Sequence, residues 1–297
     1  MICQSPESVP RPKGRGVTDR ITVPCGKCLY CLKKRQSEWS FRLSQELRES
    51  ISSIFVTLTY DDQNLPRNEL GTPTLNKRDL QLHFKRLRVH LSRDHTLVSK
   101  MEKVSENALK VPKFRYYLCG EYGTKTKRPH YHVIMFNLPF NRKNPRDYRD
   151  LVALLGSTWK MGNVHIGNVT PKSINYTTKY ITTVQQYPEG TERPFNLMSI
   201  GIGATYLDKN TNFHLDGKKF YSYLDGNKIK LPRYYTDRIF NDHERRLQAI
   251  KSRSAYDEEY TRENEKIAAT GQNPFLYRNI AYQQEVERFN HKRSKKL

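Results

Sequence analysis

The sequence predicts an α+β fold: a central, mainly antiparallel sheet flanked by helices, with a cysteine-rich N-terminal extension and a C-terminal extension of hairpins and helices. Between residues 54 and 183, patterns typical of strands and helices follow in the order strand, helix, strand, strand, helix, strand, helix. Only a short polar turn separates the second and third strands. These two strands are therefore expected to form an antiparallel hairpin.

The N-terminal stretch predicts a loop, a cysteine cluster and a helix. Residues 10–24 are rich in Pro, Gly and Arg, which favours a loop leading to "CGKCLYC". The next stretch, "LKKRQSEWSFRLSQELRES", has apolar residues at helical spacing and basic residues on its other face. Its apolar positions are Leu32, Trp39, Leu43 and Leu47. A basic amphipathic helix is expected here.

The first half of the core contains three predicted strands and one helix. The stretch "SIFVTLTYDD" is β-branched and aromatic, which predicts a strand over 54–60. An apolar stripe in "NKRDLQLHFKRLRVHLSR" predicts a helix over 77–92. Further strands are expected over 113–121 and 130–136, joined by the turn in "YGTKTKR".

Two helix starts with the same chemistry mark the second half of the core. Asn144 is placed to cap a helix with Pro145 at its first position, and Gly156 can end it. A fourth strand follows in "GNVHIGNV", and Thr170 with Pro171 opens another helix through "INYTTKYITT".

Beyond residue 189 the patterns are weaker. The stretch "PFNLMSIGIGATYL" predicts a loop and then a short strand or turn, and two Asp-Gly turns in "NFHLDGKKFYSYLDGNKIKLP" predict hairpins. A charged helical region and a basic end, "HKRSKKL", complete the chain. We therefore expect a cysteine-rich metal-binding segment with a basic helix over 1–50, a core over 51–190 and an extension over 191–297.

Composition points to a polyanionic partner. The 297 residues include 52 Lys and Arg against 30 Asp and Glu, a net charge of +22 that is spread along the chain. Such a field favours nucleic acid, and a basic but merely solvated surface is the alternative. No apolar run is long enough to cross a bilayer, and "MICQSPESVP" does not have the layout of a signal peptide. An intracellular, soluble protein without a membrane partner is expected.

Four of the five cysteines suggest a metal site. Cys25, Cys28 and Cys31 form two overlapping CxxC units, and Cys3 can add a fourth thiolate. Four thiolates form a closed structural zinc site, which we favour. An iron–sulfur cluster uses similar spacing, but its usual run continues to a fourth cysteine and a proline. Free thiols in a reducing cytoplasm are the other alternative.

The stretch "RPHYHVIMF" places two histidines on one predicted strand. Because residues two apart share a face of a strand, His130 and His132 present two imidazoles together and Tyr131 points the other way. Nine histidines make such a pair common by chance, so its surroundings must decide. Glu121 ends the preceding strand and is expected opposite His130, where it can complete a Mg or Mn site; Cys119 is expected opposite His132 as a buried apolar residue.

A later helix supplies a candidate nucleophile. In "NYTTKY", Tyr176 and Tyr180 lie one turn apart on a shared face with Lys179 beside them. The pair can instead pack the helix on the sheet. A second pair of this spacing, Tyr256 and Tyr260, lies in the acidic stretch "YDEEY", where we expect surface or packing roles.

These residue types fit one reaction. A tyrosine hydroxyl, with an ordinary pKa near ~10, needs an activated target. A divalent ion on a DNA phosphate polarises the phosphorus, so that tyrosine attack can leave a 5′-phosphotyrosine link and a free 3′-hydroxyl. Lys179 would neutralise charge on the phosphate or the phenolate.

The motifs "FVTLTY", "GEYGTKTKRPHYHVIMF" and "YTTKY" resemble, in order and spacing, the three motifs of the HUH endonucleases that initiate rolling-circle replication. With "PCGKCLYCLKKRQSEW" and "PFNLMSIGIGATYL", the chain resembles the replication initiators of gokushovirus-type microviruses as far as about residue 207. The resemblance implies an HUH fold with the tyrosine helix across the histidine face of the sheet. It also implies alternating use of Tyr176 and Tyr180, and a third metal ligand whose place varies within the family.

The same resemblance implies single-stranded or supercoiled origin DNA as the substrate and a place in the cytoplasm of the infected bacterial host. A host helicase and a host polymerase are possible partners. Two other hypotheses remain open from the residues themselves. One is a non-catalytic, zinc-containing nucleic-acid-binding protein. The other is a zinc hydrolase using His130 and His132, disfavoured because HExxH and a nearby third histidine are absent.

Overall fold

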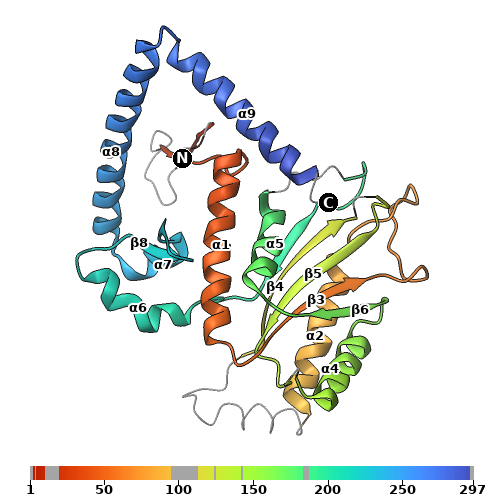
Figure 1. Cartoon of the computed structure of the whole chain (residues 1–297). Coiled ribbons are helices and arrows are strands. Elements are labelled where there is room, and N and C mark those ends of the chain that lie inside the picture. The colour runs from red at the N-terminus through yellow and green to blue at the C-terminus, as the bar shows by residue number, and fades with distance from the viewer. Residues whose placement is uncertain are drawn as a thin grey trace. The chain divides into compact units, whose positions relative to one another are not determined.

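The structure is a computed structural model that describes residues 3, 5–10, 20–94, 113–123, 125–141, 143–182 and 187–294. The chain divides into two compact units, Met1–Asp208 and Lys209–Leu297 (Figure 1). Each unit is described by itself below. The segments that lie outside the described residues include the start of the loop expected over 10–24 and the basic end over 295–297.

A five-stranded antiparallel sheet forms the centre of the first unit, in the order β6-β3-β5-β4-β7 (Figure 1). The strands are β3 (Ser53–Thr59), β4 (Arg115–Tyr122), β5 (Pro129–Phe136), β6 (Val164–Gly167) and β7 (Phe195–Met198). The hairpin expected between the second and third strands is β4–β5. The predicted α+β class with a mainly antiparallel sheet is confirmed.

One face of the sheet packs on α2 (Lys77–Arg93) and α4 (Pro145–Thr158). The apolar stripe expected in the first of these helices, including Leu80, Phe84 and Leu87, is buried against this face of the sheet. Tyr131 lies in the same cluster, and its hydroxyl donates to the carbonyl of Asn76 at 3.2 Å. Tyr131 therefore points away from His130 and His132, as expected.

The opposite face packs on α1 (Leu29–Glu49) and α5 (Pro171–Thr182) (Figure 1). Leu43 of α1 and Ile174 of α5 join Tyr117, Ile134 and Phe136 of the sheet in a second apolar cluster. The two helices also touch each other, with Oγ of Ser40 2.9 Å from Oγ1 of Thr178. The face of the sheet that carries the two histidines is therefore the face covered by the tyrosine helix.

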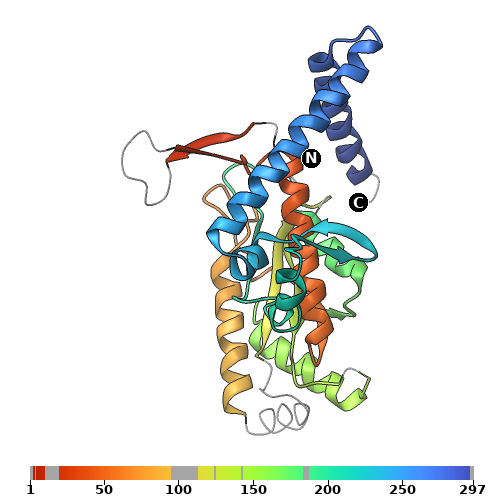
Figure 2. The ribbon, with the colours of Figure 1, turned by 90° about the vertical axis from the view of Figure 1, so that its left-hand side faces the viewer.

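Three expectations in this unit are corrected. Residues 20–23 of the expected N-terminal loop form β2 (Arg20–Val23), which pairs with β1 (Glu7–Pro10) in a hairpin that extends away from the sheet (Figure 2). Gly156 does not end α4, because the helix continues to Thr158, whose hydroxyl donates to the carbonyl of Leu154 at 2.9 Å. The stretch expected as a loop and short strand provides β7, which pairs with β4.

The second unit begins within α6 (Thr205–Leu215), a helix that the sequence did not predict. The first expected Asp-Gly turn, at Asp216, follows this helix rather than joining two strands. The second joins β8 (Tyr221–Leu224) to β9 (Asn227–Lys230), as predicted. A short helix, α7 (Arg233–Ile239), follows, and Phe240 stacks on Phe220 at 3.8 Å between ring centroids.

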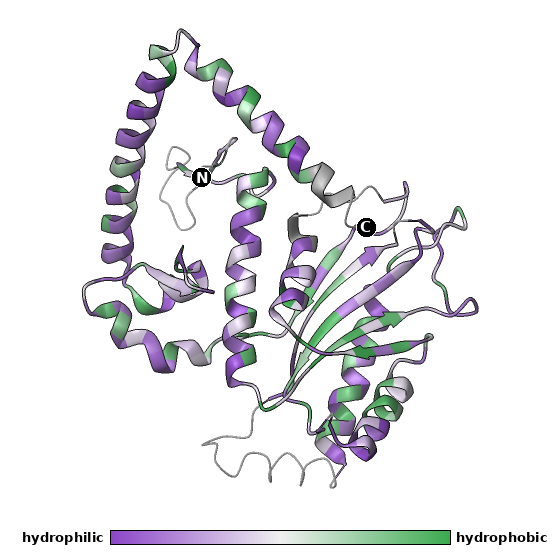
Figure 3. Ribbon diagram, viewed as in Figure 1, coloured by the Kyte–Doolittle hydropathy of each residue, from purple (hydrophilic) through white to green (hydrophobic). Residues whose placement is uncertain are grey.

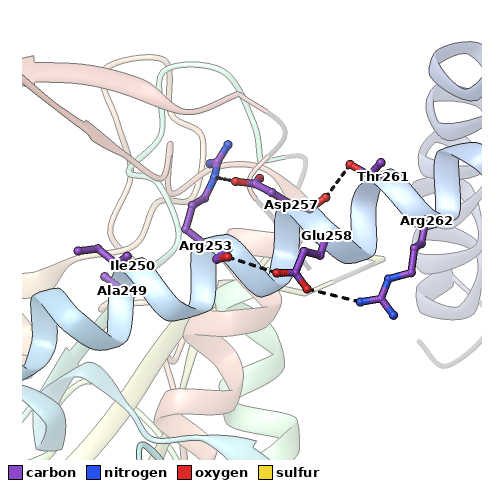
Figure 4. A pocket seen from close by; sticks show the side chains of 8 residues that line it. Ala249, Ile250, Arg253, Asp257, Glu258, Thr261 and Arg262 are labelled. Atoms are coloured by element: carbon purple, nitrogen blue, oxygen red, sulfur yellow. Dashed lines mark hydrogen bonds and ion pairs between the residues drawn. The ribbon is translucent and has the colours of Figure 1, made fainter.

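Two long helices, α8 (Asp242–Ala269) and α9 (Pro274–Ser294), complete the described chain. Asn241 and Glu244 form a capping box at the start of α8, and Figure 3 shows that helix as mostly hydrophilic. Ion pairs one turn apart run along it, including Arg253 with Asp257 at 2.9 Å and Arg262 with Glu258 at 3.6 Å (Figure 4). Within the described residues, no helix combines the length and the apolar character needed to cross a membrane.

Candidate functional site

The strand register brings three possible metal ligands to one place on the sheet. In the β4–β5 hairpin Glu121 pairs with His130, and Cys119 pairs with His132, as the residue count predicted. Because alternate residues of a strand share a face, Glu121, His130 and His132 all project toward the side of the sheet that packs on α5. Cys119 is fully buried, in agreement with the packing role expected for it.

The three side chains converge closely. Nε2 of His130 lies 2.7 Å and Nε2 of His132 lies 2.8 Å from the same oxygen, Oε1 of Glu121. The ligand atoms of the three residues lie within 4.8 Å of one another. Glu121 and His132 are buried and His130 is half-buried. A carboxylate and two imidazoles in a largely dry site form a plausible pocket for a divalent cation.

Burial and charge oppose each other at these groups. Burial alone would raise the pKa of the Glu121 carboxyl, but hydrogen bonds from the two imidazoles outweigh it and lower that pKa. Burial alone would lower the pKa of His130, but the hydrogen bond and charge of Glu121 outweigh it and raise that pKa. Glu121 is therefore held as a carboxylate, the form that binds a cation.

The second ring nitrogen of each histidine is engaged elsewhere. Nδ1 of His130 lies 3.2 Å from the carbonyl oxygen of Arg128, an acceptor, so this nitrogen carries the proton. Nδ1 of His132 lies 3.1 Å from Oγ1 of Thr57, which can accept in the same way. With protons at Nδ1, both Nε2 atoms keep a lone pair directed at the centre of the site.

Two residues of β3 that sequence reasoning missed surround His132. Thr57 is its direct neighbour across the β3–β5 pair, and the Phe55 ring stacks on the His132 ring at 5.5 Å and 15°. The motif "FVTLTY" held both residues, but its sequence does not say which strand lies beside β5. Together they fix the plane of the His132 ring.

The first tyrosine of α5 reaches the site. Its hydroxyl lies 3.4 Å from Nε2 of His132, and the Tyr176 ring stands edge-on to the His132 ring at 5.1 Å. Phe55 contacts the same tyrosine edge-on at 6.3 Å. The Tyr176 side chain is nevertheless 40% exposed, so a substrate can approach its hydroxyl from solvent.

The other residues expected from this helix are less well defined. Lys179 is half-buried on α5. The backbone of Tyr180 belongs to α5, but its side chain lies outside the described residues. The comparison pair, Tyr256 and Tyr260, packs within the α8–α9 hairpin, where the Arg278 guanidinium lies 4.3 Å from the Tyr260 ring centre. That pair therefore has the packing role expected for it.

The cysteine cluster forms a second possible metal centre. The Sγ atoms of Cys3, Cys25, Cys28 and Cys31 lie within 4.8 Å of one another. The N–H of Cys25 donates to Sγ of Cys3 at 3.2 Å, and the N–H groups of Lys27 and Cys28 donate to Sγ of Cys25 at 3.4 Å. All four thiols are free of disulfides. The geometry suits four thiolates around one ion.

The turn inside the first CxxC unit prepares one thiolate. Gly26 has φ +72°, a conformation that L side chains rarely adopt, and it turns the following backbone N–H groups toward Cys25. These N–H groups lower the pKa of the Cys25 thiol to about 6. Burial raises the pKa of Cys31 to about 12. Without an ion, the cluster therefore holds thiolate and thiol together.

Comparison with a solved structure gives only a weak likeness. The N-terminal nuclease domain of minute virus of mice non-structural protein-1 is 13% identical and covers 59% of this chain and 83% of that chain, with a TM-score of 0.19. At that score the likeness supports no conclusion about this chain.

Sequence comparisons are more informative. The family model for replication-associated protein ORF2 matches residues 53–185, from the start of β3 to just beyond α5. Replication-associated protein VP4 of Bdellovibrio phage phiMH2K is 29% identical over 238 residues, 75% of this chain and 69% of the relative. Replication-associated protein ORF4 of Chlamydia phage 1 is 25% identical over 255 residues, 80% of this chain and 57% of the relative.

Replication-associated protein ORF2 of Spiroplasma virus 4 is 32% identical over 231 residues, 73% of this chain and 68% of the relative. The matched relatives are all replication-associated proteins of small phages, and the family model covers every strand and helix that builds the Glu121, His130, His132 and Tyr176 site. The chain therefore belongs to the family of replication-associated protein ORF2 and is a rolling-circle replication initiator of the microvirus type.

Proposed function

We propose that this initiator is an endonuclease and strand transferase that nicks one strand of origin DNA and later rejoins it, with Tyr176 as the attacking group. The observation that carries the proposal is the position of the Tyr176 hydroxyl, 3.4 Å from Nε2 of His132 and beside Glu121. Tyr180, one turn further along α5, would make the second cut after a round of synthesis. The two tyrosines would then alternate.

Glu121, His130 and His132 would hold one Mg²⁺ or Mn²⁺. Their ligand atoms lie within 4.8 Å, and both Nδ1 atoms have partners outside the centre. Two imidazoles and one carboxylate occupy only part of the coordination sphere of such an ion, which leaves positions for phosphate oxygens. When bound, the ion would polarise the scissile phosphate and offset the negative charge that builds up on it in the transition state.

In the nicking step, the Tyr176 oxygen forms a bond to phosphorus while the bond between phosphorus and the 3′ oxygen breaks. The phenol loses its proton and the departing 3′ oxygen gains one. The products are a free 3′-hydroxyl and a 5′-phosphotyrosine link. Because a phosphoester bond is conserved, a 3′-hydroxyl can attack the link and reseal the strand without ATP. Lys179 would neutralise part of the phosphate charge.

Origin DNA, single-stranded or supercoiled, would be the substrate. The net charge of +22 supports a polyanionic partner. A host helicase and a host polymerase would act on the nicked strand, and the place of action would be the cytoplasm of the infected bacterial host.

The four cysteines would hold a structural zinc ion. Cys25 and Cys28 flank the turn before α1, Cys31 lies in the first turn of that helix, and Cys3 precedes β1. One ion held by these four thiolates would fasten the N-terminal segment to α1. This role is structural and separate from the nicking step, because no open coordination position remains in a four-thiolate site.

The test uses the purified chain, Mn²⁺ and single-stranded DNA of the replicon that encodes it, tiled as oligonucleotides. We expect one oligonucleotide to be cut and a protein–DNA adduct that survives denaturation. The double change Tyr176→Phe and Tyr180→Phe should abolish the adduct, and His130→Ala should lower cutting at least about a hundredfold.

The matched control is the double change Tyr256→Phe and Tyr260→Phe, which removes a tyrosine pair of the same spacing from α8. This control should cut like the unchanged chain. Persistence of the adduct after both α5 tyrosines are removed would refute the assignment. DNA binding that is indifferent to His130→Ala, with no cut strand, would favour a non-catalytic binding protein.

A further inference from the structure

A pocket of about 300 Å³ opens beside the candidate metal centre and has no role in the nicking step described above. The end of β3 and the turn between β4 and β5 form its walls. The lining residues are Thr59, Gly123, Thr126, Arg128, Pro129 and His130. Because His130 belongs both to this pocket and to the proposed metal centre, a strand held by its phosphate at the centre would have neighbouring atoms within reach of the pocket.

The walls of the pocket are held in place by hydrogen bonds within the chain. The N–H of Gly123 donates to the carbonyl of Arg128 at 3.0 Å, which closes the β4–β5 turn. The Arg128 guanidinium donates to the carboxylate of Asp62 at 2.7 Å and to the carbonyl of Tyr60 at 2.8 Å. These bonds brace the turn against the end of β3. An occupant would therefore meet a pocket that is already formed.

The chemistry of the lining favours a neutral, flat group with hydrogen-bonding edges. Thr59 and Thr126 offer hydroxyls that donate and accept, and Pro129 offers an apolar ring. None of the six lining residues is acidic, and the guanidinium of Arg128 is already paired with Asp62. A volume of about 300 Å³ lies at the lower end for ligand sites, which suits one nucleotide unit rather than a length of strand.

We propose that this pocket binds the base of one nucleotide directly next to the scissile phosphate. The hydroxyls of Thr59 and Thr126 would bind the edge of that base. This inference rests on the proposed function, since the metal centre delivers the strand. It adds that the enzyme depends on a base at only one side of the nick, and that the β4–β5 turn determines which base is accepted.

Gly123 offers a way to close the pocket. A Cβ at this position would make only ordinary contacts, at 3.5 Å to Oγ1 of Thr126 and 3.6 Å to the carbonyl of Arg128. Gly123→Ala should therefore leave the pocket open, and Gly123→Leu should fill it. The substrate is the oligonucleotide cut in the preceding experiment, intact or with an abasic site at either nucleotide that flanks the nick.

With the unchanged chain, an abasic site on one side of the nick should slow adduct formation about tenfold, and an abasic site on the other side should not. Gly123→Leu should slow adduct formation on the intact oligonucleotide by a similar factor and show no further loss with the abasic one. Gly123→Ala should behave like the unchanged chain. Equal rates for the intact and both abasic oligonucleotides would overturn the proposal.

A second variant and a second readout guard against misfolding. Thr126 is exposed, so Thr126→Val should fold and should reduce the difference in rate among the four bases at the sensitive position. Unchanged base preference in Thr126→Val, together with unchanged rates in a Gly123→Leu chain that still binds Mn²⁺, would contradict the assignment.

Binding of deoxynucleoside 5′-monophosphates in the presence of Mn²⁺, measured by calorimetry, separates the two proposals. If the unchanged chain forms no adduct, the nicking proposal fails. Weaker monophosphate binding by Gly123→Leu than by Gly123→Ala would still support the pocket. Equal binding by both variants would overturn it.

Discussion

His132 has a different partner on each side, and together they hold its ring for metal binding. Oγ1 of Thr57 lies 3.1 Å from Nδ1, Phe55 stacks on one face at 5.5 Å, and Tyr176 meets the ring edge-on at 5.1 Å. A hydroxyl that accepts from Nδ1 selects the tautomer whose Nε2 can bind an ion. Thr57 therefore acts on the metal through His132, as a positioning residue.

Replacing Thr57 tests this role. Thr57→Val removes the acceptor at nearly constant volume, and we expect Mn²⁺ affinity to fall about 10- to 100-fold, measured by calorimetry or by the signal of free Mn²⁺. Thr57→Ser keeps the hydroxyl and should restore most of the affinity. Equal affinities in the valine and serine variants would show that the hydroxyl does not orient His132.

A buried histidine on α2 should make stability depend on pH. His83 is fully buried against Phe84 and Trp159, and burial lowers its pKa to about 4. The unfolded chain takes up this proton near pH ~6.5 and the folded chain does not, so stability is lost as the pH falls between these values. The loss attributable to His83 reaches about 3 kcal/mol near pH ~4.

In His83→Leu this part of the acid sensitivity should disappear, as measured by urea unfolding at several pH values. His90→Gln, an exposed histidine of the same helix, should keep the pH profile of the unchanged chain. A His83→Leu profile as steep as that of the unchanged chain would mean that His83 is charged in the folded state.

The two histidines and their carboxylate were within reach of sequence reasoning because the whole arrangement is local. Nine residues separate Glu121 from His130, and one hairpin turn sets the register that pairs them. Thr57 and Phe55 were out of reach because β3 precedes β5 by some seventy residues, and which strands become neighbours is decided by packing. The metal and catalytic roles of these residues stay predictions.

At the scale of elements, one buried carboxylate holds α1 against the sheet. Glu46 is 3% exposed, its oxygens accept from the Arg115 guanidinium at 2.9 and 3.2 Å, and it accepts from the N–H of Gly203 at 2.7 Å. These bonds join α1, β4 and the loop before α6. Removing one partner of such a group leaves buried polar atoms without compensation.

Glu46→Ala should therefore lower the free energy of unfolding by about 3 kcal/mol. The matched control is Glu38→Ala on the same helix, where the carboxylate faces Lys34 at 3.9 Å in a partly exposed pair and should contribute about 0.5 kcal/mol or less. Urea unfolding measures both. Similar losses in the two variants would contradict the role of Glu46.

The cysteine cluster belongs to the same scale, because it joins the N-terminal segment to α1. We expect one zinc ion per purified chain by elemental analysis and a lower melting temperature after chelation. Cys25→Ser should lose the zinc, while Cys119→Ala, which removes a buried thiol outside the cluster, should keep it. A chain that folds and purifies without zinc would contradict this assignment.

Elements with strong periodicity or clear caps were predicted close to their observed ends. Asn144 and Pro145 open α4, and the apolar stripe of α2 lies on the sheet. The short strands β1, β2 and β7 have only four residues each, too few for a periodic pattern, and they exist because a partner strand supplies their hydrogen bonds. The predicted division into 1–50, 51–190 and 191–297 stays a prediction.

At the scale of the whole molecule, the charge is the dominant feature. A net charge of +22 implies that binding to single-stranded DNA releases several counterions. If about five phosphates are neutralised, affinity should fall about 100-fold between about 50 and about 200 mM salt, as followed by fluorescence anisotropy. Binding that is insensitive to salt would mean that the charge does not face the DNA.

The central claim is that Tyr176 attacks DNA beside a metal held by Glu121, His130 and His132. The most direct measurement is mass spectrometry of the trapped adduct after trypsin digestion, because cleavage after Lys172 and Lys179 separates Tyr176 from Tyr180. On a substrate with a single cut site, we expect the nucleotide on the peptide "SINYTTK". A nucleotide on a residue outside α5, or a cut strand without any adduct, would contradict the account.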